Sequence, residues 1–305
     1  MHFDPSDNPE SRLTRRRALQ LLGATALVPL VPGCARLPEG STGGNGSGRL
    51  VNVTLTVNGA ILQNSLSGRN FYYFFLFNLT DNSTDPGPIP VITAPFGNGF
   101  AAPNNSTKSN GQRAQGFIGF VLYSPVFIGG SGFGLYRVPV DPSDSTQFVD
   151  VTTLSLNGGF TGPSAVDSAT PVAAGSSTLN FRLNLKNLLP TGTTTTTLPR
   201  YLQFNIITTD NLPQGGDTSV QKLWDALGNG LQAESTNTDS QLAPYLIADI
   251  TQNAVYRNSD FQGNSSKYEV QGDVYNQGFP VSAADFPTIV PGLDIVDWTV
   301  QITSG

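Results

Sequence analysis

Residues 71–77 read FYYFFLF, a run of seven residues that contains six aromatic rings. A half-buried strand alternates apolar and polar side chains, so an unbroken run predicts a strand that is covered on both faces. Seven residues are too few to span a bilayer, and an exposed strand of this kind would aggregate. We therefore expect a central strand, with Tyr72 and Phe74 on one face and Tyr73 and Phe75 on the other.

One face of this strand should lie in the core, and the other face needs a cover of its own. Three covers are possible: a helix predicted around Trp224, the loop of residues 81–115, or a bound ligand. An open row of aromatic rings would be a binding surface. We favour a cover supplied by the protein's own helix and loops.

The rest of the chain from residue 50 onward reads as short strands separated by turns. The sequence holds 33 Gly and 22 Pro residues, which favour turns, and it shows no repeat of fixed period. The expected strands are residues 50–57, 71–79, 117–123, 135–140, 148–156, 179–185, 201–208, 245–251, 268–275 and 295–302. This pattern predicts an all-β fold, an antiparallel β-sandwich of about ten strands with one short docked helix and long loops.

The predicted helix covers residues 218–228, TSVQKLWDALG. Leu223, Trp224 and Leu227 recur at helical spacing, and Gly228 follows as a stop signal. We interpret Trp224 as a packing anchor of this helix.

Two further local signals concern the connections. The pair Asn58-Gly59 follows the first expected strand and predicts a hairpin turn. Residues 81–115 and 157–177 lack clear elements, and loops of this length are usually functional or disordered.

The chain carries few charges for its 305 residues. Charged residues make up 12% of it, against about 25% in an average globular protein. Residues 34–305 hold 12 basic and 19 acidic side chains, because four of the 16 basic and three of the 22 acidic residues precede them. The resulting formal charge of about −7, without a basic stripe, argues against nucleic-acid binding and against attraction to anionic lipid headgroups.

The amino terminus resembles a bacterial export signal. Residues 14–34, TRRRALQLLGATALVPLVPGC, combine a basic start, a short apolar run and a small-residue site. Arg15 and Arg16 fit the twin-arginine export motif, although Ala18 and Gln20 depart from its usual Phe and Lys. The apolar run is too short and too interrupted for a transmembrane helix.

Residues 31–34, VPGC, resemble a lipobox, in which Cys34 is lipidated and becomes the first residue of the mature chain. The resemblance implies a signal peptide (1–33), a lipidated cysteine with a flexible tether (34–48) and a single β-sandwich domain (49–305). It also implies a location in the bacterial cell envelope, outside the cytoplasm, with the lipid as membrane anchor. The alternative is a cytoplasmic basic tail followed by a buried helix, with Cys34 as an inert thiol.

The chain has one histidine, His2, and one cysteine, Cys34. A mature chain that begins at Cys34 therefore cannot form a Ser-His-Asp triad or an ordinary zinc, copper or haem site. Glycoside hydrolysis by two carboxylates stays possible. Asp294 and Asp297 are three residues apart, so in a strand they project to opposite faces, and Glu269 lies in no motif.

Calcium is the one metal that the composition permits, since it prefers carboxylate and carbonyl oxygens. Residues 81–85 and 141–144 place Asp and Asn side chains in turns, and Asp210 follows a strand. None of these stretches forms a defined calcium loop, so we interpret them as Asx turns. We predict no metal site and no cofactor.

Three stretches of the body resemble DOMON-like and carbohydrate-binding β-sandwich modules of exported bacterial proteins. They are residues 71–81 (FYYFFLFNLTD), 201–211 (YLQFNIITTDN) and 294–302 (DIVDWTVQI), and they transfer no functional residue. We expect a non-catalytic binding module for a neutral glycan or another envelope component, since aromatic and uncharged polar side chains suit such a ligand. The expected contacts are Tyr72, Tyr73, Tyr123 and Tyr136.

Two other functions stay open at this point. The protein could be a structural component of the cell envelope that binds another protein. It could also be a glycoside hydrolase, which requires two inward carboxylates roughly 5 to 10 Å apart in a cleft.

Overall fold

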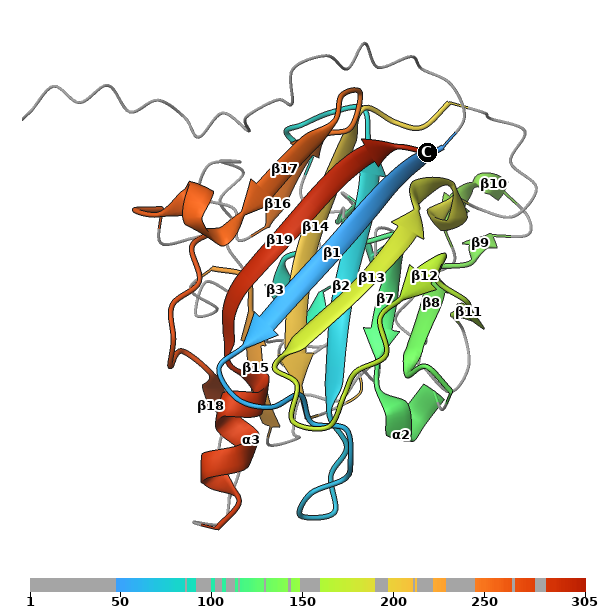
Figure 1. Ribbon diagram of the computed structural model, residues 1–305. Helices are drawn as coiled ribbons and strands as arrows, with labels where there is room; N and C mark the ends of the chain where they lie inside the picture. Colours follow the sequence, from blue (N-terminus) through green and yellow to red (C-terminus); the bar gives the residue numbers. More distant parts are fainter. Residues whose placement is uncertain are drawn as a thin grey trace, which may run out of the picture. The chain divides into compact units, whose positions relative to one another are not determined.

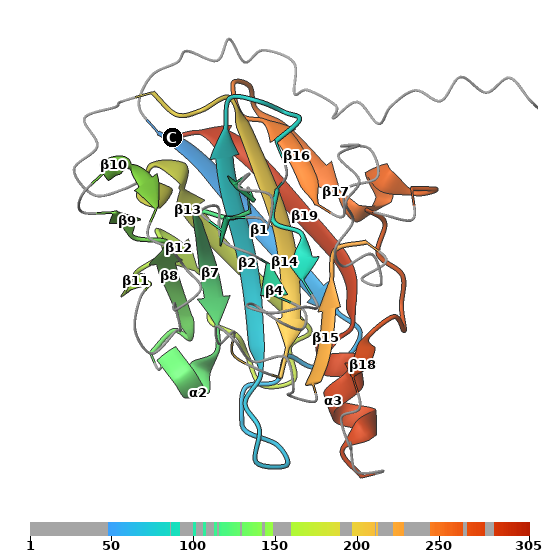
Figure 2. The same ribbon diagram turned by 180° about the vertical axis from the view of Figure 1, so that it is seen from behind.

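The computed structural model describes residues 48–85, 87–91, 100–101, 106–107, 113–114, 116–128, 130–141, 144–148, 160–189, 197–210, 212, 222–228, 245–264, 267–277 and 284–305. All of them belong to one compact unit, Ala35–Gly305. Thirteen strands form two antiparallel sheets that lie face to face (Figure 1; Figure 2, from behind). This arrangement confirms the prediction of an all-β sandwich with a short helix.

The five-stranded sheet lies toward the viewer in Figure 1. Its order is β12 (Ser168–Ala169), β13 (Thr178–Asn184), β1 (Arg49–Val57), β19 (Ile295–Ser304) and β17 (Ala254–Arg257). Buried apolar residues alternate with more exposed polar ones along β1 and β13, as expected of a sheet with one face in water. Val53 pairs with Phe181 on one side and with Val300 on the other, so the inward residues form a continuous apolar row.

The eight-stranded sheet contains the aromatic run. Its order is β11 (Thr161–Ser164), β8 (Phe133–Arg137), β7 (Gly119–Tyr123), β2 (Tyr72–Thr80), β14 (Tyr201–Thr209), β15 (Lys222–Ala226) and β18 (Tyr275–Gln277), and β16 (Leu246–Asp249) pairs with β14 outside this path. The strand β2 pairs with β7 on one side and with β14 on the other. It is therefore a central strand, as predicted.

Short elements complete the described structure. The two-residue strands β3 (Pro90–Val91) and β4 (Phe100–Ala101) pair, as do β5 (Ser106–Thr107) with β6 (Arg113–Ala114) and β9 (Val140–Asp141) with β10 (Asp144–Phe148). The helices are α2 (Pro125–Ile128), α3 (Phe286–Leu293) and two 3₁₀ turns, η2 (Leu185–Leu188) and η4 (Asn258–Phe261). Within the described part of the chain, none of these helices has the length and apolarity needed to span a membrane.

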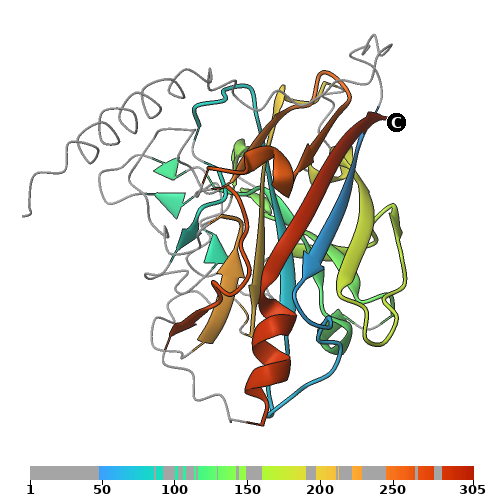
Figure 3. The same ribbon diagram turned by 60° about the vertical axis from the view of Figure 1, so that its left-hand side comes forward.

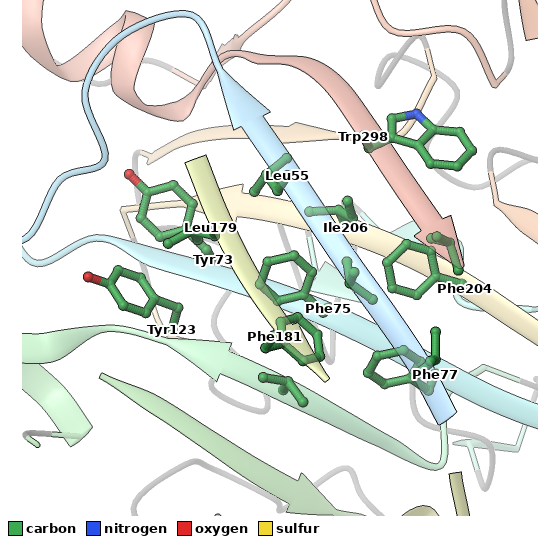
Figure 4. Packing of buried hydrophobic residues seen from close by; sticks show 14 of the residues in the cluster. Leu55, Tyr73, Phe75, Phe77, Tyr123, Leu179, Phe181, Phe204, Ile206 and Trp298 are labelled. Carbon is green, nitrogen blue, oxygen red and sulfur yellow. The ribbon is translucent and has the colours of Figure 1, made fainter. Parts of the chain in front are cut away.

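The main core fills the space between the two sheets (Figure 4). Tyr73, Phe75 and Phe77 point from β2 toward the other sheet, where Phe75 and Phe77 contact Phe181 of β13. The ring centroids of Phe75 and Phe181 lie 4.8 Å apart in an edge-to-face arrangement. Each such side chain is fully buried, which stabilises the fold by about 2 to 3 kcal/mol relative to an exposed one.

The opposite face of β2 is covered as well. Tyr72, Phe74 and Leu76 belong to a second buried cluster that includes Phe120 and Trp224. The ring centroids of Phe74 and Phe120 lie 5.6 Å apart. The aromatic run is therefore enclosed by protein on both faces, but the helix expected to cover it around Trp224 is a strand of the same sheet.

Part of this cover comes from the loop that follows β2. The side-chain amide of Gln203 donates to the carbonyl of Asp85, and that of Asn205 donates to the carbonyl of Pro88 at 2.7 Å. Asn78 donates to Gln203 at 2.7 Å, so the buried amides on this face of the sheet satisfy one another. The beginning of the predicted 81–115 loop is thus a structural cover.

The predicted helix of residues 218–228 is wrong. Residues Lys222–Ala226 form β15, whose residues pair with β14 and β18. Leu223 belongs to the main core, whereas Trp224 belongs to the cluster on the other face of the sheet. Because both faces are buried, apolar residues at helical spacing fit a strand equally well, and pairing with the sheet overrides helix propensity.

The short helix of the fold is α3, whose residues read FPTIVPGL. Pro287 lies in the first turn, where its missing N–H is not needed, and Pro291 lies near the end of the helix. Figure 3 shows that α3 leads directly into β19. This helix was not predicted.

The predicted hairpin at Asn58-Gly59 is also wrong, because β1 and the next long strand, β2, belong to different sheets. The backbone N–H of Asn58 donates to the carbonyl of Asp294, and that of Gly59 donates to the carbonyl of Pro291. A Cβ atom on Gly59 would lie 2.8 Å from the Cβ of Pro291, so glycine is required here for a close approach to α3.

Most of the other predicted strands are present within a few residues. Some predicted strands differ more. Of residues 268–275, Tyr275 alone lies in a strand, and residues 135–140 are divided between β8 and β9. Residue 148 ends β10, and residues 149–156 lie outside the described residues. The sequence patterns missed β11, β12 and β17, which are short.

Candidate functional site

The four tyrosines that we expected to contact a ligand are buried. Their exposed fractions are 5% for Tyr72, 0% for Tyr73, 2% for Tyr123 and 3% for Tyr136. Tyr72 and Tyr136 belong to the outer cluster, and Tyr73 and Tyr123 belong to the main core. Their rings form no exposed surface here. Arg15, Arg16 and Cys34 lie outside the described residues.

Tyr73 has a structural role that its hydroxyl group explains. The hydroxyl accepts a hydrogen bond from the backbone N–H of Leu62 and donates one to the carbonyl of Gly292, each at 2.8 Å. Burial raises the pKa of Tyr73 above its ordinary value. Burial also raises the pKa of Tyr123, to about 12. Tyr73 therefore links the segment after β1 to the end of α3.

Two of the predicted Asx turns can be compared with the structure. The side-chain oxygen of Asn82 accepts from the backbone N–H of Thr84 at 3.1 Å, so the prediction for residues 81–85 is confirmed. Asp210 differs: its side chain is fully buried, and its Oδ2 forms an ion pair with Arg69 Nη1 at 2.8 Å. Asp210 therefore has a charged partner that its sequence context does not indicate.

Three acidic side chains from two separate segments meet in the interior. Asp225 lies on β15, and Glu269 and Asp273 lie in the segment that precedes β18. One oxygen of each carboxyl group lies within 4.8 Å of the corresponding oxygens of the other two. We call these three residues the carboxylate cluster. If all three were ionised, each pair would repel by about 3 kcal/mol or more.

Asp225 is held by backbone groups of both sheets. Its Oδ2 accepts from the backbone N–H of Ile295, the first residue of β19, at 2.7 Å, and its Oδ1 accepts from that of Ala226 at 2.8 Å. Burial raises the pKa of Asp225 well above its ordinary value, and the carboxyl groups of Asp273 and Asp294 add to this rise. The two N–H groups act in the opposite direction without cancelling it.

Glu269 is fixed at its backbone but not at its carboxyl group. Asn258 accepts from the N–H of Glu269 at 2.8 Å and donates to its carbonyl at 3.2 Å. The residue is 1% exposed, and among the described residues neither carboxyl oxygen has a hydrogen-bond partner. Burial raises the pKa of Glu269 well above its ordinary value, and Asp225 and Asp273 add to the rise. The backbone N–H of Gly228 opposes this effect, although it does not meet the geometry of a hydrogen bond to either oxygen.

Asp273 completes the cluster, and Asp294 lies beside it. Burial, reinforced by the charge of Asp294, raises the pKa of Asp273 to about 6. Asp294 ends α3, and its carboxyl oxygens accept from the backbone N–H of Gly272 at 2.9 and 3.1 Å and from the Asn58 side chain at 3.0 Å. Asp297 is exposed on β19, whereas Asp294 is buried and precedes this strand, so the prediction that they project to opposite faces of one strand does not apply.

The carboxylate cluster has two chemical possibilities. Buried carboxyl groups this close together either retain protons or share a cation that neutralises them. Its atoms are oxygens, which are the donors that hard cations such as Ca²⁺ prefer. Sequence reasoning missed the cluster because positions 225, 269 and 273 form no local motif, and strand pairing brings them together.

The outer face of the five-stranded sheet carries a second group of polar residues. Strand pairing aligns its side chains in three rows across β13, β1 and β19. The rows are Arg182–Asn52–Gln301, Asn180–Thr54–Thr299 and Thr178–Thr56–Asp297. The Arg182 side chain donates to Asn52 at 3.0 Å and the Asn180 side chain donates to Thr54 at 3.3 Å, which orders two of the rows.

Comparison of the chain with protein families, with curated proteins and with solved structures finds no match.

Proposed function

We propose that this protein is a lipid-anchored, extracytoplasmic β-sandwich that acts as a non-catalytic binding module for a neutral glycan. The proposed location rests on Arg15, Arg16 and Cys34, in the order of an export motif followed by a lipobox. Covalent lipid attached to Cys34, followed by a Gly- and Ser-rich tether, would hold the sandwich at the membrane surface.

The observation that carries the binding proposal is the polar outer face of the five-stranded sheet. Seven of its nine aligned side chains are uncharged, and one Arg and one Asp complete them. Amide groups both donate and accept hydrogen bonds, and hydroxyl groups do the same, which matches the hydroxyl groups of a sugar. Neighbouring strands repeat about every 5 Å, so the face offers a regular array of such groups.

Two features support binding in preference to hydrolysis. Asp225 and Glu269 are each 1% exposed, so a polysaccharide would have no access to them in this conformation. One oxygen of each carboxyl group in the cluster lies within 4.8 Å of the corresponding oxygens of the other two. A glycosidase needs carboxyl groups about 5 Å apart or more, with the scissile bond between them.

Retention of the full-length chain on immobilised envelope polysaccharides and on glycan arrays tests the binding proposal. We expect retention by the wild type and a loss of roughly tenfold in affinity for the double variant Asn52→Ala/Gln301→Ala, because it removes two amides from one row. Gln262→Ala, an exposed amide away from this face, is the matched control and should bind as the wild type does. Absence of any retained glycan would contradict the proposal, and recovery of a stoichiometric protein neighbour by cross-linking would favour a structural role.

Cell fractionation tests the proposed location. Cys34→Ser should move the protein from the membrane fraction to the soluble fraction outside the cytoplasm, because the lipid attachment point is lost. Arg15→Lys/Arg16→Lys should keep it in the cytoplasm, since the twin-arginine motif would be lost. An unchanged distribution of both variants would contradict the proposed location.

A further inference from the structure

We propose that the carboxylate cluster of Asp225, Glu269 and Asp273 binds one divalent cation of the calcium type. This site is separate from the polar outer face of the five-stranded sheet, and the proposal does not depend on glycan binding. Asp294 lies beside the cluster and adds a further negative charge to it.

The spacing of the oxygens suits a single ion. One oxygen of each carboxyl group lies within 4.8 Å of the others. Ca²⁺ binds oxygens at about 2.3 to 2.6 Å, so two ligands on opposite sides of the ion are about 5 Å apart. A single Ca²⁺ between the three carboxyl groups can therefore contact all of them after small side-chain adjustments.

Glu269 gives an independent sign that a ligand belongs here. Its carboxyl group is buried beside Asp225 and Asp273, and neither of its oxygens has a hydrogen-bond partner among the described residues. Both carboxyl oxygens of Asp273 are likewise buried without a partner in this part of the chain. Buried polar atoms are nearly always satisfied, so four such oxygens in one place indicate a missing partner of positive charge.

The surrounding residues hold the cluster in place. The side chain of Asn258 forms hydrogen bonds with both the N–H and the carbonyl of Glu269, and the N–H of Ile295 donates to Asp225. The N–H of Gly272 binds Asp294, which orients the turn that carries Asp273. Groups that orient ligands from behind in this way are typical of metal sites, where they fix the direction of each carboxyl group.

The donor set favours calcium over other metals. Zinc, copper and iron sites usually contain His or Cys, and the chain has neither after Cys34. Mg²⁺ binds at about 2.0 to 2.1 Å in strict octahedral geometry and retains several waters, which suits a buried site poorly. Ca²⁺ accepts irregular oxygen ligation and sheds water more readily.

A bound ion would connect the two sheets. Asp225 belongs to β15 of the eight-stranded sheet, and its carboxyl group also contacts the start of β19 in the five-stranded sheet. Glu269 and Asp273 belong to the segment between η4 and β18. The ion would thus join β15, this segment and the junction of α3 with β19, and its binding should stabilise all three.

Calcium binding to the full-length chain, stripped with EDTA, tests the proposal by equilibrium dialysis and by the thermal unfolding midpoint. We expect one Ca²⁺ per chain, with a dissociation constant of roughly 0.1 to 1 mM, the range typical of calcium-binding extracellular modules, and a rise of the midpoint with calcium concentration. Mg²⁺ should bind more weakly. Failure of wild-type protein to bind Ca²⁺ at about 10 mM, or tighter binding of Mg²⁺, would overturn the proposal.

Matched variants decide whether the cluster is the site. Glu269→Gln keeps the size of the side chain and removes a buried charge, so the metal-free variant should unfold at the same or a higher temperature than the metal-free wild type. Its calcium affinity should fall by about tenfold or more. Asp273→Asn, at a half-buried position, should show the same loss. Asp297→Asn alters an exposed carboxyl group three residues from Asp294 and should bind Ca²⁺ as the wild type does. Equal losses in Glu269→Gln and Asp297→Asn would overturn the assignment of the site.

Discussion

Buried carboxyl groups occur at two places near β15, and their partners differ: Asp210 follows β14 and bonds to the backbone of β15, whereas Asp225 lies on β15 itself. Asp210 has partners from the protein: Arg69 Nη1 lies 2.8 Å from its Oδ2, and the backbone N–H of Leu223 donates to its Oδ1 at 2.8 Å. In the carboxylate cluster that contains Asp225, the neighbouring charges that act on the pKa values are other carboxyl groups. Asp210 thus has a guanidinium group as its charged neighbour, whereas the charged neighbours within the cluster are carboxyl groups.

This difference shows what a buried charge requires in this fold. An isolated carboxylate in the interior is costly unless a cation or several donors face it. At Asp210 the sequence supplies that cation as Arg69. At the carboxylate cluster, neutralisation must come from protons or from an ion taken up from solution, which is the basis of the calcium proposal.

The largest effect is expected when the paired site is broken. Arg69→Met should lower the free energy of unfolding by about 2 to 3 kcal/mol, because it leaves Asp210 buried and unpaired, although Arg69 itself is partly exposed. Urea denaturation of the variant and the wild type gives this value.

The matched control for this prediction is Arg200→Met. Arg200 pairs with Asp249 at 2.8 Å on the surface, where solvent screens the charges, so its loss should change the free energy of unfolding much less than the loss of Arg69 does. Equal losses in the two variants would show that burial does not distinguish the two ion pairs.

A neutral buried group provides an intermediate effect. Tyr73→Phe should lower the free energy of unfolding by about 2 kcal/mol, because the N–H of Leu62 and the carbonyl of Gly292 both lose their partner. The ring of Tyr123 lies next to that of Tyr73, and its hydroxyl makes no hydrogen bond among those described. Tyr123→Phe should therefore lower the free energy of unfolding less than Tyr73→Phe does. A smaller loss in Tyr73→Phe than in Tyr123→Phe, measured by urea denaturation, would contradict the assigned role of the Tyr73 hydroxyl.

The smallest expected effect is a difference in the sign of two pH dependences. Burial raises the pKa of Asp210 above its ordinary value of 3.8, in spite of Leu223 and Arg69. Burial also acts to raise the pKa of Asp249, but Thr251 and Arg200 outweigh it and hold the pKa below 3.8. The stability that Asp210 contributes is therefore greatest below pH 3.8 and is lost as pH rises through its folded pKa. The contribution of Asp249 is present above pH 3.8 and is lost as pH falls through its folded pKa.

Comparison of the wild type with Asp210→Asn and with Asp249→Asn isolates these contributions. The free energy of unfolding of the wild type minus that of Asp210→Asn should decrease between about pH 3 and pH 7, whereas the same difference for Asp249→Asn should increase. Slopes of the same sign in the two comparisons would show that the environments of these carboxyl groups do not differ as described.

The sequence predicted the long strands well because their residues alternate or are apolar throughout. The runs that became β1, β2, β14 and β19 are each eight or more residues of strand-forming sequence, and their pattern leaves little choice of structure. Leu223, Trp224 and Leu227 fit helical spacing, which predicts a helix where the structure has the strand β15. When both faces of a strand are buried, that pattern cannot distinguish a strand from a helix.

The candidate sites were the part least accessible to sequence reasoning. The chemistry of the four tyrosines suits contacts with a ligand, but the same aromatic character places them in two buried clusters. Glu269 lies in no sequence motif, and Asp225 lies within the predicted helix of residues 218–228. These acids are 44 positions apart along the chain, so no local spacing could connect them.

The amino-acid pattern by itself determined a two-sheet β architecture with an aromatic centre, because hydrophobic periodicity and turn residues act locally and survive in any arrangement of the strands. Tertiary structure alone decided which polar groups meet. Pairing of β15 with β14, and the passage from α3 into β19, bring distant carboxyl groups into one low-dielectric space. Their charges interact strongly there because water is excluded, and this property belongs to the folded chain and not to any segment of it.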